Sequence, residues 1–210
     1  MRNFLPPTEF FREKKIEIFF LEKQKKIVDE IKSYSESSIN KINFEEEADN
    51  IIKRSNFKVP KLIKEGTTTG ISTLILSGRQ LPPGRFYQQG RNYEVEVADY
   101  GVPFEGNKDF FKIYPSKYHS KNVEAVLNTN GLVFRLTNYG KITGNETEIE
   151  NLKREFLANI DATEKTLLQI EKELTDYLPK LRALIIQSLE NRKQFLNSKK
   201  DSTDKLNPFN

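Results

Sequence analysis

The stretch from Asn145 to about Leu196 carries the most regular pattern in the chain and constrains the fold more than any other feature. Its apolar positions recur in alternating steps of three and four residues over four heptads, which places them on one stripe of a helix. The members of this stripe are Ile149, Phe156, Ile160, Thr163, Leu167, Ile170, Leu174 and Tyr177. A second run at helical spacing comprises Leu181, Leu184, Ile185, Leu189, Phe195 and Leu196.

Pro179 lies between the two runs and predicts a break. Proline lacks an N–H and clashes with the carbonyl one turn back, but it is tolerated in the first turn of a new helix. Asp176 is a candidate N-cap just ahead of it. A short connection makes the two helices antiparallel neighbours, so we expect a coiled-coil-like helical hairpin over residues 145–197.

The charges favour pairing of these two helices. From Asn145 to Asp176 there are nine acidic and four basic side chains, whereas from Lys180 to Lys200 there are six basic and one acidic. The flanks would attract each other, although exposed pairs contribute only ~0–1 kcal/mol each. Two interpretations stay open: a hairpin within one chain, and a coiled coil that also recruits a second chain.

The composition suits a soluble protein with one globular unit and the hairpin as an appendage. Apolar residues make up 36% of the 210 positions and charged residues 30%. The absence of cysteine and the single histidine exclude disulfides, thiolate metal sites and imidazole-rich sites, so we expect no metal and no cofactor. No signal peptide and no long apolar run is present, which predicts a cytoplasmic protein without a membrane partner.

Residues 1–57 are expected to form the N-terminal helices. Thr8 is the candidate N-cap of a first helix that runs to about Ser33, and residues 33–40 indicate a loop. A second helix should run from Phe44 to Ser55 with Asn43 as its cap. Three glutamates crowd its first turn, where the helix dipole favours negative charge. Adjacent helical side chains diverge, so these carboxylates are not expected to form a metal or acid–base site.

Residues 58–140 indicate a small, mainly antiparallel sheet of about four or five strands, one face of which rests on the helices. The overall fold class is therefore α+β. The strongest turn signal is the Asn128–Gly131 segment, which predicts a hairpin. The expected strands are 59–63, 71–76, 92–97, 123–127 and 132–136, and residues 80–90 are expected to be a loop.

The segment 101–120 is the candidate functional region, because it combines aromatic residues, glycines, lysines and the single histidine. One interpretation is a contact loop, since binding residues are often found on loops held by a rigid scaffold. The other, which we favour, is that the aromatic rings anchor a long connection to the sheet edge. The candidate contact residues are Phe104, Phe110, Phe111, Tyr114, Lys117, Tyr118 and His119.

Several segments resemble a family of small bacterial proteins of unassigned activity associated with anti-phage defence loci. The resemblance covers most of the chain. It rests on Phe44-Glu-Glu-Glu-Ala48, Val59-Pro-Lys-Leu62, Tyr93–Val97 leading into Val102-Pro-Phe-Glu-Gly106, Phe111 with Tyr114-Pro-Ser116, Asn130-Gly-Leu-Val-Phe134 and the helical pair. It implies a place in a bacterial multi-component system, but it carries over no catalytic residues.

The leading functional hypothesis is a non-catalytic protein–protein interaction or scaffold subunit. Its partner would be another protein subunit or a second copy, bound through the hairpin or the segment 101–120. Residues 198–210 are expected to be a polar tail that resembles a docking segment.

Two alternatives stay open. A nuclease or other enzyme would use Arg91, Lys112, Lys117 and His119. Nucleic-acid binding is less favoured, because the net charge of +4 is spread thinly: residues 1–60 carry 12 basic and 11 acidic groups, residues 61–140 carry 10 and 7, and residues 141–210 carry 12 and 12.

Overall fold

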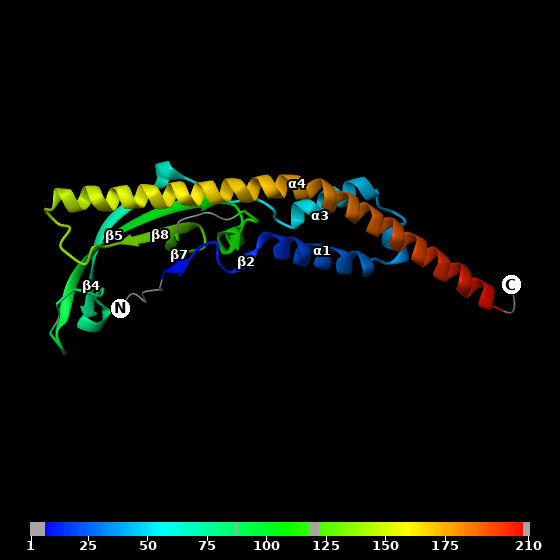
Figure 1. The fold of residues 1–210 in the computed structure, drawn as a ribbon. Helices are drawn as coiled ribbons and strands as arrows, with labels where there is room; N and C mark the ends of the chain where they lie inside the picture. The colour runs from blue at the N-terminus through cyan, green and yellow to red at the C-terminus, as the bar shows by residue number, and fades with distance from the viewer. Residues whose placement is uncertain (1–6, 87, 118–121, 208–210) are drawn as a thin grey trace.

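One long C-terminal helix is the spine of the molecule, and the rest of the chain packs along it (Figure 1). The structure, a computed structural model, describes residues 7–86, 88–117 and 122–207. Its helices are α1 (Ile16–Lys32), α2 (Glu36–Ile39), α3 (Phe44–Arg54) and α4 (Glu146–Leu206), with 3-10 turns at Lys64–Gly66, Gly78–Gln80 and Lys108–Lys112. Its strands are β1 (Thr8–Glu9), β2 (Lys14–Lys15), β3 (Lys61–Leu62), β4 (Thr68–Ser77), β5 (Asn92–Glu105), β6 (Ile113–Tyr114), β7 (Glu124–Leu127) and β8 (Gly131–Leu136).

The expected antiparallel sheet is confirmed, with six strands. Its order is β1-β7-β8-β5-β3, and β4 also pairs with β5. The predicted hairpin joins β7 to β8, and the Asn128 N–H donates to the carbonyl of Gly131 at 2.9 Å across the turn. Short β2 and β6 form a separate parallel pair. The predicted α+β class is therefore confirmed.

The predicted helical hairpin is wrong: residues 146–206 form a single helix of 61 residues with Pro179 inside it. At 1.5 Å per residue, α4 is about 90 Å long. Asp176 is an interior residue of this helix and not a cap. Figure 1 shows that α4 changes direction in its orange part, near residues 175–185, where the missing N–H and the proline ring are expected to bend a helix. The residues of the expected tail up to Leu206 continue α4.

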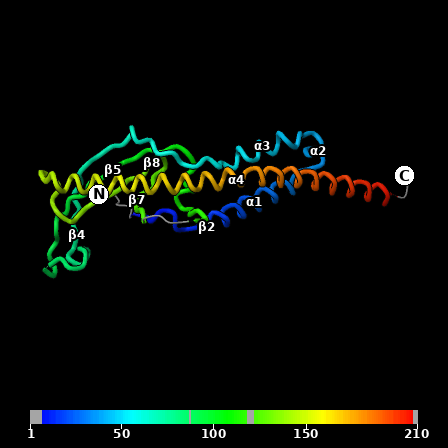
Figure 2. Tube along the Cα trace, turned by 45° about the horizontal axis from the view of Figure 1, so that its top comes forward, coloured from blue at the N-terminus to red at the C-terminus, as the bar shows by residue number. Residues whose placement is uncertain are grey.

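Contacts from the N-terminal helices hold α4 together across the proline. The ring of Tyr177 stacks on Phe20 of α1 with centroids 3.9 Å apart, and its hydroxyl donates to the Phe20 carbonyl at 3.1 Å. Beyond the proline, Arg182 Nε donates to Asp49 of α3 at 2.7 Å. In Figure 2, α4 runs between α1 and α3. These contacts on both sides of Pro179 offset the ~3 kcal/mol that proline costs in a helix interior.

The apolar stripe of the sequence is buried, but against other elements and not against a second half of the hairpin. Phe156 lies under the sheet, with its ring stacked on Tyr100 of β5 at 4.2 Å. Farther along α4, Ile170, Leu181 and Ile185 are almost completely buried. The periodicity identified the buried face correctly; it does not encode which surface covers that face.

The basic second half of α4 pairs with the acidic start of α3. Arg182 bridges Glu45 at 2.6 Å and Asp49 at 2.7 Å, while Arg192 donates to the Tyr34 carbonyl at 2.9–3.0 Å. The glutamates at the start of α3 thus belong to a helix interface. Asn43 caps α3 as predicted, since its side chain accepts from the Glu45 N–H at 3.0 Å.

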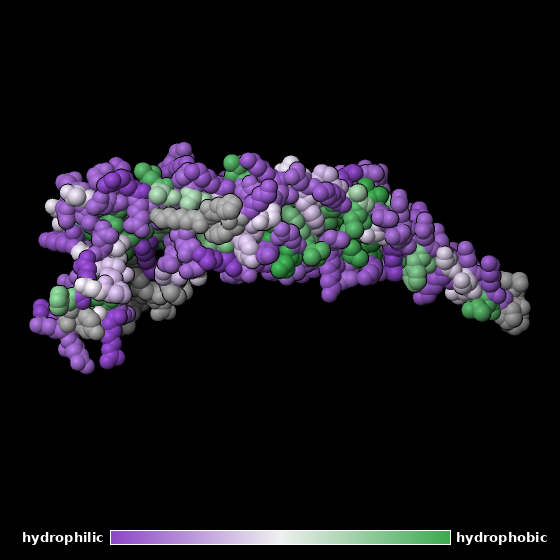
Figure 3. Space-filling view, in the orientation of Figure 1, coloured by the Kyte–Doolittle hydropathy of each residue, from purple (hydrophilic) through white to green (hydrophobic). Residues whose placement is uncertain are grey.

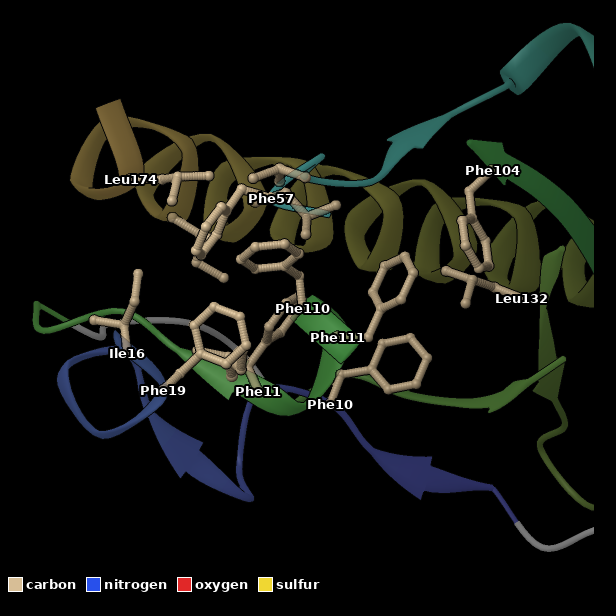
Figure 4. Close-up of a cluster of buried hydrophobic side chains, with 14 of the residues drawn as sticks. Phe10, Phe11, Ile16, Phe19, Phe57, Phe104, Phe110, Phe111, Leu132 and Leu174 are labelled. Carbon is tan, nitrogen blue, oxygen red and sulfur yellow. The ribbon is translucent and has the colours of Figure 1, made fainter. Parts of the chain in front are cut away.

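A cluster of phenylalanine rings joins the sheet to the N-terminal segment (Figure 4). Phe10 and Phe111 lie 5.2 Å apart between centroids, Phe104 meets Phe111 at 4.9 Å, and Phe19 meets Phe110 at 5.3 Å. The first helix starts at Ile16, because β1 and β2 before it are extended and pair with β7 and β6. Thr8 lies in β1 and does not cap a helix.

The β4–β5 hairpin projects from the body as an arm. β5 is 14 residues long, and only its part from Ala98 onward pairs with β8, so the stretch 92–97 pairs with β4 alone. Figures 1 and 2 show this arm leaving the body at the end opposite α1 and α3. The candidate contact segment 101–120 is therefore not a loop from its start, because its residues 101–105 belong to β5.

Candidate interaction surfaces

The candidate contact residues of the segment 101–120 separate into core and surface. Phe104 on β5 and Phe110 and Phe111 on the 3-10 turn are buried. Tyr114 is partly buried, and Lys117 is exposed. Tyr118 and His119 lie outside the described residues.

This segment is also attached to the spine. Ser116 donates from its backbone N–H and from its hydroxyl, at 2.8 Å, to the carboxylate of Glu173 on α4. Of its described aromatic rings, those of Phe104, Phe110 and Phe111 lie in the core.

The groups proposed for an enzyme do not converge among the described residues. Arg91 belongs to the projecting arm, and Lys112 pairs with Glu13 at 3.4 Å beside α1. The described residues contain no group of three or more acidic, histidine or cysteine side chains placed to hold a metal ion. No described helix is long and apolar enough to span a bilayer.

Strand β4 is an open edge of the sheet. Glu96, which faces Thr73 in the register, donates its N–H to Gly140, and its carbonyl accepts from Thr137, so both backbone groups point away from β4. Because these directions alternate along an antiparallel pair, the backbone groups of Thr73 point outward. The same direction holds for every second residue of β4, namely Thr69, Ile71, Thr73, Ile75 and Ser77. The N–H of Ser77 is already paired, because it donates to the Gln80 side chain at 2.9 Å.

The outward-bonding positions of β4 carry no charge and no proline. Their side chains lie on the same face, where Ile71 is 54% exposed and Ile75 is 66% exposed. Within the described part of the chain, β4 pairs only with β5. Natural edge strands are usually protected by charges, prolines or bulges against pairing with another chain. The ten residues of β4 lack all three, which identifies the edge as a surface able to accept a strand.

An apolar groove adjoins this edge. It has a volume of about 430 Å³ and lies between β4 and the first turns of α4. Ile71 and Tyr100 line the sheet side, while Ile149, Phe156 and Leu157 line the helix side. Leu157 is 54% exposed. A side chain from a strand added to β4 could enter this groove from the open edge.

The arm is fastened to the body at its base. The Glu96 carboxylate accepts from the backbone N–H groups of Thr143 at 2.6 Å and Ile142 at 2.5 Å. These bonds hold the pKa of Glu96 below its usual value, and the bond from the Thr143 N–H has the largest effect. Arg85 of the loop after β4 donates to the carbonyls of Tyr139, at 2.8 Å, and Asn138. The edge strand is therefore held in a defined position.

The end of the arm forms a basic surface. Residues 77–93 contain three arginines and no acidic residue. Arg79 and Arg91 line a hollow of about 630 Å³, and Arg91 also lies 5.9 Å from the Tyr93 ring centroid. Phe86, in the same segment, is fully exposed. No arginine of this segment forms an ion pair with another described residue. We call Arg79, Arg91 and Phe86 the arginine tip.

The free end of α4 is the third exposed feature. All residues from 197 to 206 are exposed, and Phe195 and Leu206 are 58% and 82% exposed. In Figure 3 the projecting end is mainly hydrophilic, with separate hydrophobic spots. In this view the spots are separated from one another by hydrophilic surface.

Comparison with known proteins adds no identification: no family model, curated protein or solved structure matches the chain. The surfaces described above were not singled out by the sequence pattern. The run of β-branched residues in β4 was visible, but its position at the sheet edge depends on how the strands are ordered.

Proposed function

We propose that this protein is a non-catalytic interaction or scaffold subunit that binds another polypeptide by strand addition at the β4 edge. The observation that carries this proposal is the row of outward-pointing backbone groups from Thr69 to Ile75 on an uncharged edge strand, to which no other strand of the described residues bonds. An added strand would satisfy these groups, and its alternate side chains would lie beside Ile71 and Ile75. The apolar groove next to the edge gives such side chains a place to bury.

The shape of the molecule supports a scaffold role. A continuous helix of about 90 Å connects the arm at one end with the helical bundle at the other. The resemblance of the chain to bacterial defence-associated proteins leads us to propose that the partner belongs to a multi-component system of that kind. A cytoplasmic location is part of the same proposal.

Strand addition is tested with two substitutions at Thr73. Proline removes the outward N–H without touching the bonds to β5, whereas alanine keeps that N–H. We expect wild type and Thr73→Ala to co-purify with the same protein at fixed stoichiometry from the source cell, and Thr73→Pro to lose it. Retention of that protein by a folded Thr73→Pro variant would contradict the proposal.

Nucleic-acid binding is a second candidate, favoured by the arginine tip. Arginines and an exposed aromatic ring in one short segment suit phosphate contacts and base stacking on single strands. We expect wild type to shift a single-stranded oligonucleotide at low salt, and Arg79→Ala/Arg91→Ala to weaken binding about tenfold or more. Lys199→Ala/Lys200→Ala on the free end of α4 removes the same charge and is the matched control. Equal binding by all three proteins would reject the tip as a nucleic-acid site.

A further inference from the structure

We propose that the strand accepted by β4 is β4 of a second copy of this chain, paired antiparallel with Thr73 opposite the partner's Thr73. This inference rests on the proposed function, because it requires that the β4 edge binds a strand. It adds the identity of the partner, the symmetry of the complex and the register of pairing.

The first support is the order of side chains along the outward-bonding positions of β4. Read from residue 69, they are Thr, Ile, Thr, Ile and Ser. This order is nearly the same in both directions. A strand that pairs antiparallel with its own copy about Thr73 therefore places Ile71 opposite the partner's Ile75. Thr69 faces the partner's Ser77 in the same arrangement, so each residue meets one of its own kind.

The second support is the direction of the backbone groups. Residues that pair through hydrogen bonds in an antiparallel ladder must each point N–H and C=O at the other strand. The N–H and C=O of Thr73 point outward in this way, because the backbone groups of Glu96, which lies opposite Thr73, bond on the side away from β4. A two-fold axis at the Thr73 pair therefore gives about six main-chain hydrogen bonds over the three central facing pairs, Ile71 with the partner's Ile75, Thr73 with the partner's Thr73, and Ile75 with the partner's Ile71. Such a closed, symmetric contact is the commonest way in which identical chains associate.

The third support is chemical compatibility across the axis. β4 carries no charged residue, so two copies meet without like-charge repulsion. Facing threonine pairs and facing β-branched apolar pairs both stabilise antiparallel strands. Placing the axis at Ser72 would also preserve the bonding, but it would set Ile71 opposite the partner's Thr73 and Ile75 opposite the partner's Thr69. The Thr73 axis is preferred because it pairs isoleucine with isoleucine.

The apolar groove fits the same arrangement. The partner's Ile75 would lie on the same face as Ile71 and next to it, on the side of the open edge. The groove between Ile71 and Leu157 lies on this face. Four isoleucines, two from each copy, would then cover one another and the exposed Leu157 side chains.

Single cysteines test the register, because the natural chain contains none. Opposed Cα atoms of a hydrogen-bonded pair lie about 5.5 Å apart, within reach of a disulfide. We expect Thr73→Cys to form a covalent dimer under mild oxidation. Ser77→Cys is the matched control, because residues four positions from the axis lie about 27 Å from their symmetry mates. Linkage at both positions alike, or at neither, would overturn this register.

Association without a cross-link is measured by analytical ultracentrifugation of the complete protein. We expect wild type and Thr73→Ala to form dimers, Ile75→Lys to raise the dissociation constant about tenfold or more, and Thr73→Pro to be monomeric with an unchanged circular dichroism spectrum. A wild type that stays monomeric at about 100 µM would overturn self-pairing, yet it would leave strand addition to another protein intact. The proposed function is contradicted by a different result, namely that a folded Thr73→Pro variant still retains the cellular partner.

Discussion

Tyr177 shows at the residue scale how the spine is attached to the N-terminal segment. Its ring stacks on Phe20 and its hydroxyl donates to the carbonyl of the same residue, 157 positions earlier in the chain. Burial raises the pKa of Tyr177 to about 12. One side chain therefore combines an apolar contact, a hydrogen bond and a proton held more tightly in the folded than in the unfolded state.

This pKa predicts a loss of stability in alkali. The unfolded chain releases the Tyr177 proton near pH 10 and the folded chain near pH 12, so the free energy of unfolding falls as the pH rises between these values. Tyr177→Phe removes the titrating hydroxyl. Between pH 9.5 and 12 we expect the free energy of unfolding of the variant to fall by about 1–2 kcal/mol less than that of wild type, after allowance for solvent screening of a half-buried group.

Urea unfolding at a series of pH values measures this difference. At pH 7 the variant should be less stable by about 1 kcal/mol, because the hydroxyl bond to Phe20 is lost. Parallel pH profiles for the two proteins would contradict the assigned pKa.

The arginine tip shows why a charge count by thirds of the chain was too coarse. Residues 61–140 have only three more basic than acidic side chains, which suggested a mild bias. The segment 77–93 alone carries three arginines without an acid, so it accounts for an excess of the same size. A shorter window would have found the cluster. Its projection on an arm depends on the pairing of β4 with β5 and cannot be obtained from composition.

At the scale of elements, α4 tests the interpretation of an interior proline. Pro179→Ala restores one N–H and removes the clash with the carbonyl of Thr175, and alanine can adopt the same backbone conformation. We expect the free energy of unfolding to rise by about 1–3 kcal/mol, measured by urea denaturation. Lys180→Ala, at the next exposed position, should change it by less than about 0.5 kcal/mol. A destabilised Pro179→Ala variant would show that the packing of α1 and α3 requires the proline.

The sequence predicts elements better than their partners. The periods of α4, α3 and the β7–β8 hairpin could be recognised because local spacing and caps such as Asn43 determine them. The hairpin at Pro179 was a reasonable but wrong choice, since an apolar stripe can be covered by any matching surface and tertiary contacts outweighed the local signal. The β4 edge was beyond prediction for the same reason: which backbone groups stay unpaired depends on the order of all strands.

At the scale of the whole molecule, stability is unevenly distributed along the spine. Residues 197–206 are exposed, and Lys200 among them pairs with Glu36 at 3.7 Å. We expect a chain that ends at Asn197 to unfold within about 0.5 kcal/mol of wild type, since exposed pairs contribute little. A chain that ends at Leu184 is the contrasting control, because it loses the buried Ile185 and Leu189.

Thermal and urea unfolding of the two truncated proteins checks this distribution. The longer one should keep a single cooperative transition at the wild-type midpoint, and the shorter one should unfold much earlier. A clear drop in stability of the protein that ends at Asn197 would mean that the free end of α4 packs on the body.

The order of the elements along the chain has a consequence for synthesis, because α4 follows every element that it covers. α1 and α3 are translated before the residues of α4 that contact them or the turn after α1, such as Tyr177, Arg182 and Arg192. The sheet is likewise translated before Phe156, which stacks on it. The apolar faces of these earlier elements therefore have no covering helix until α4 has been translated.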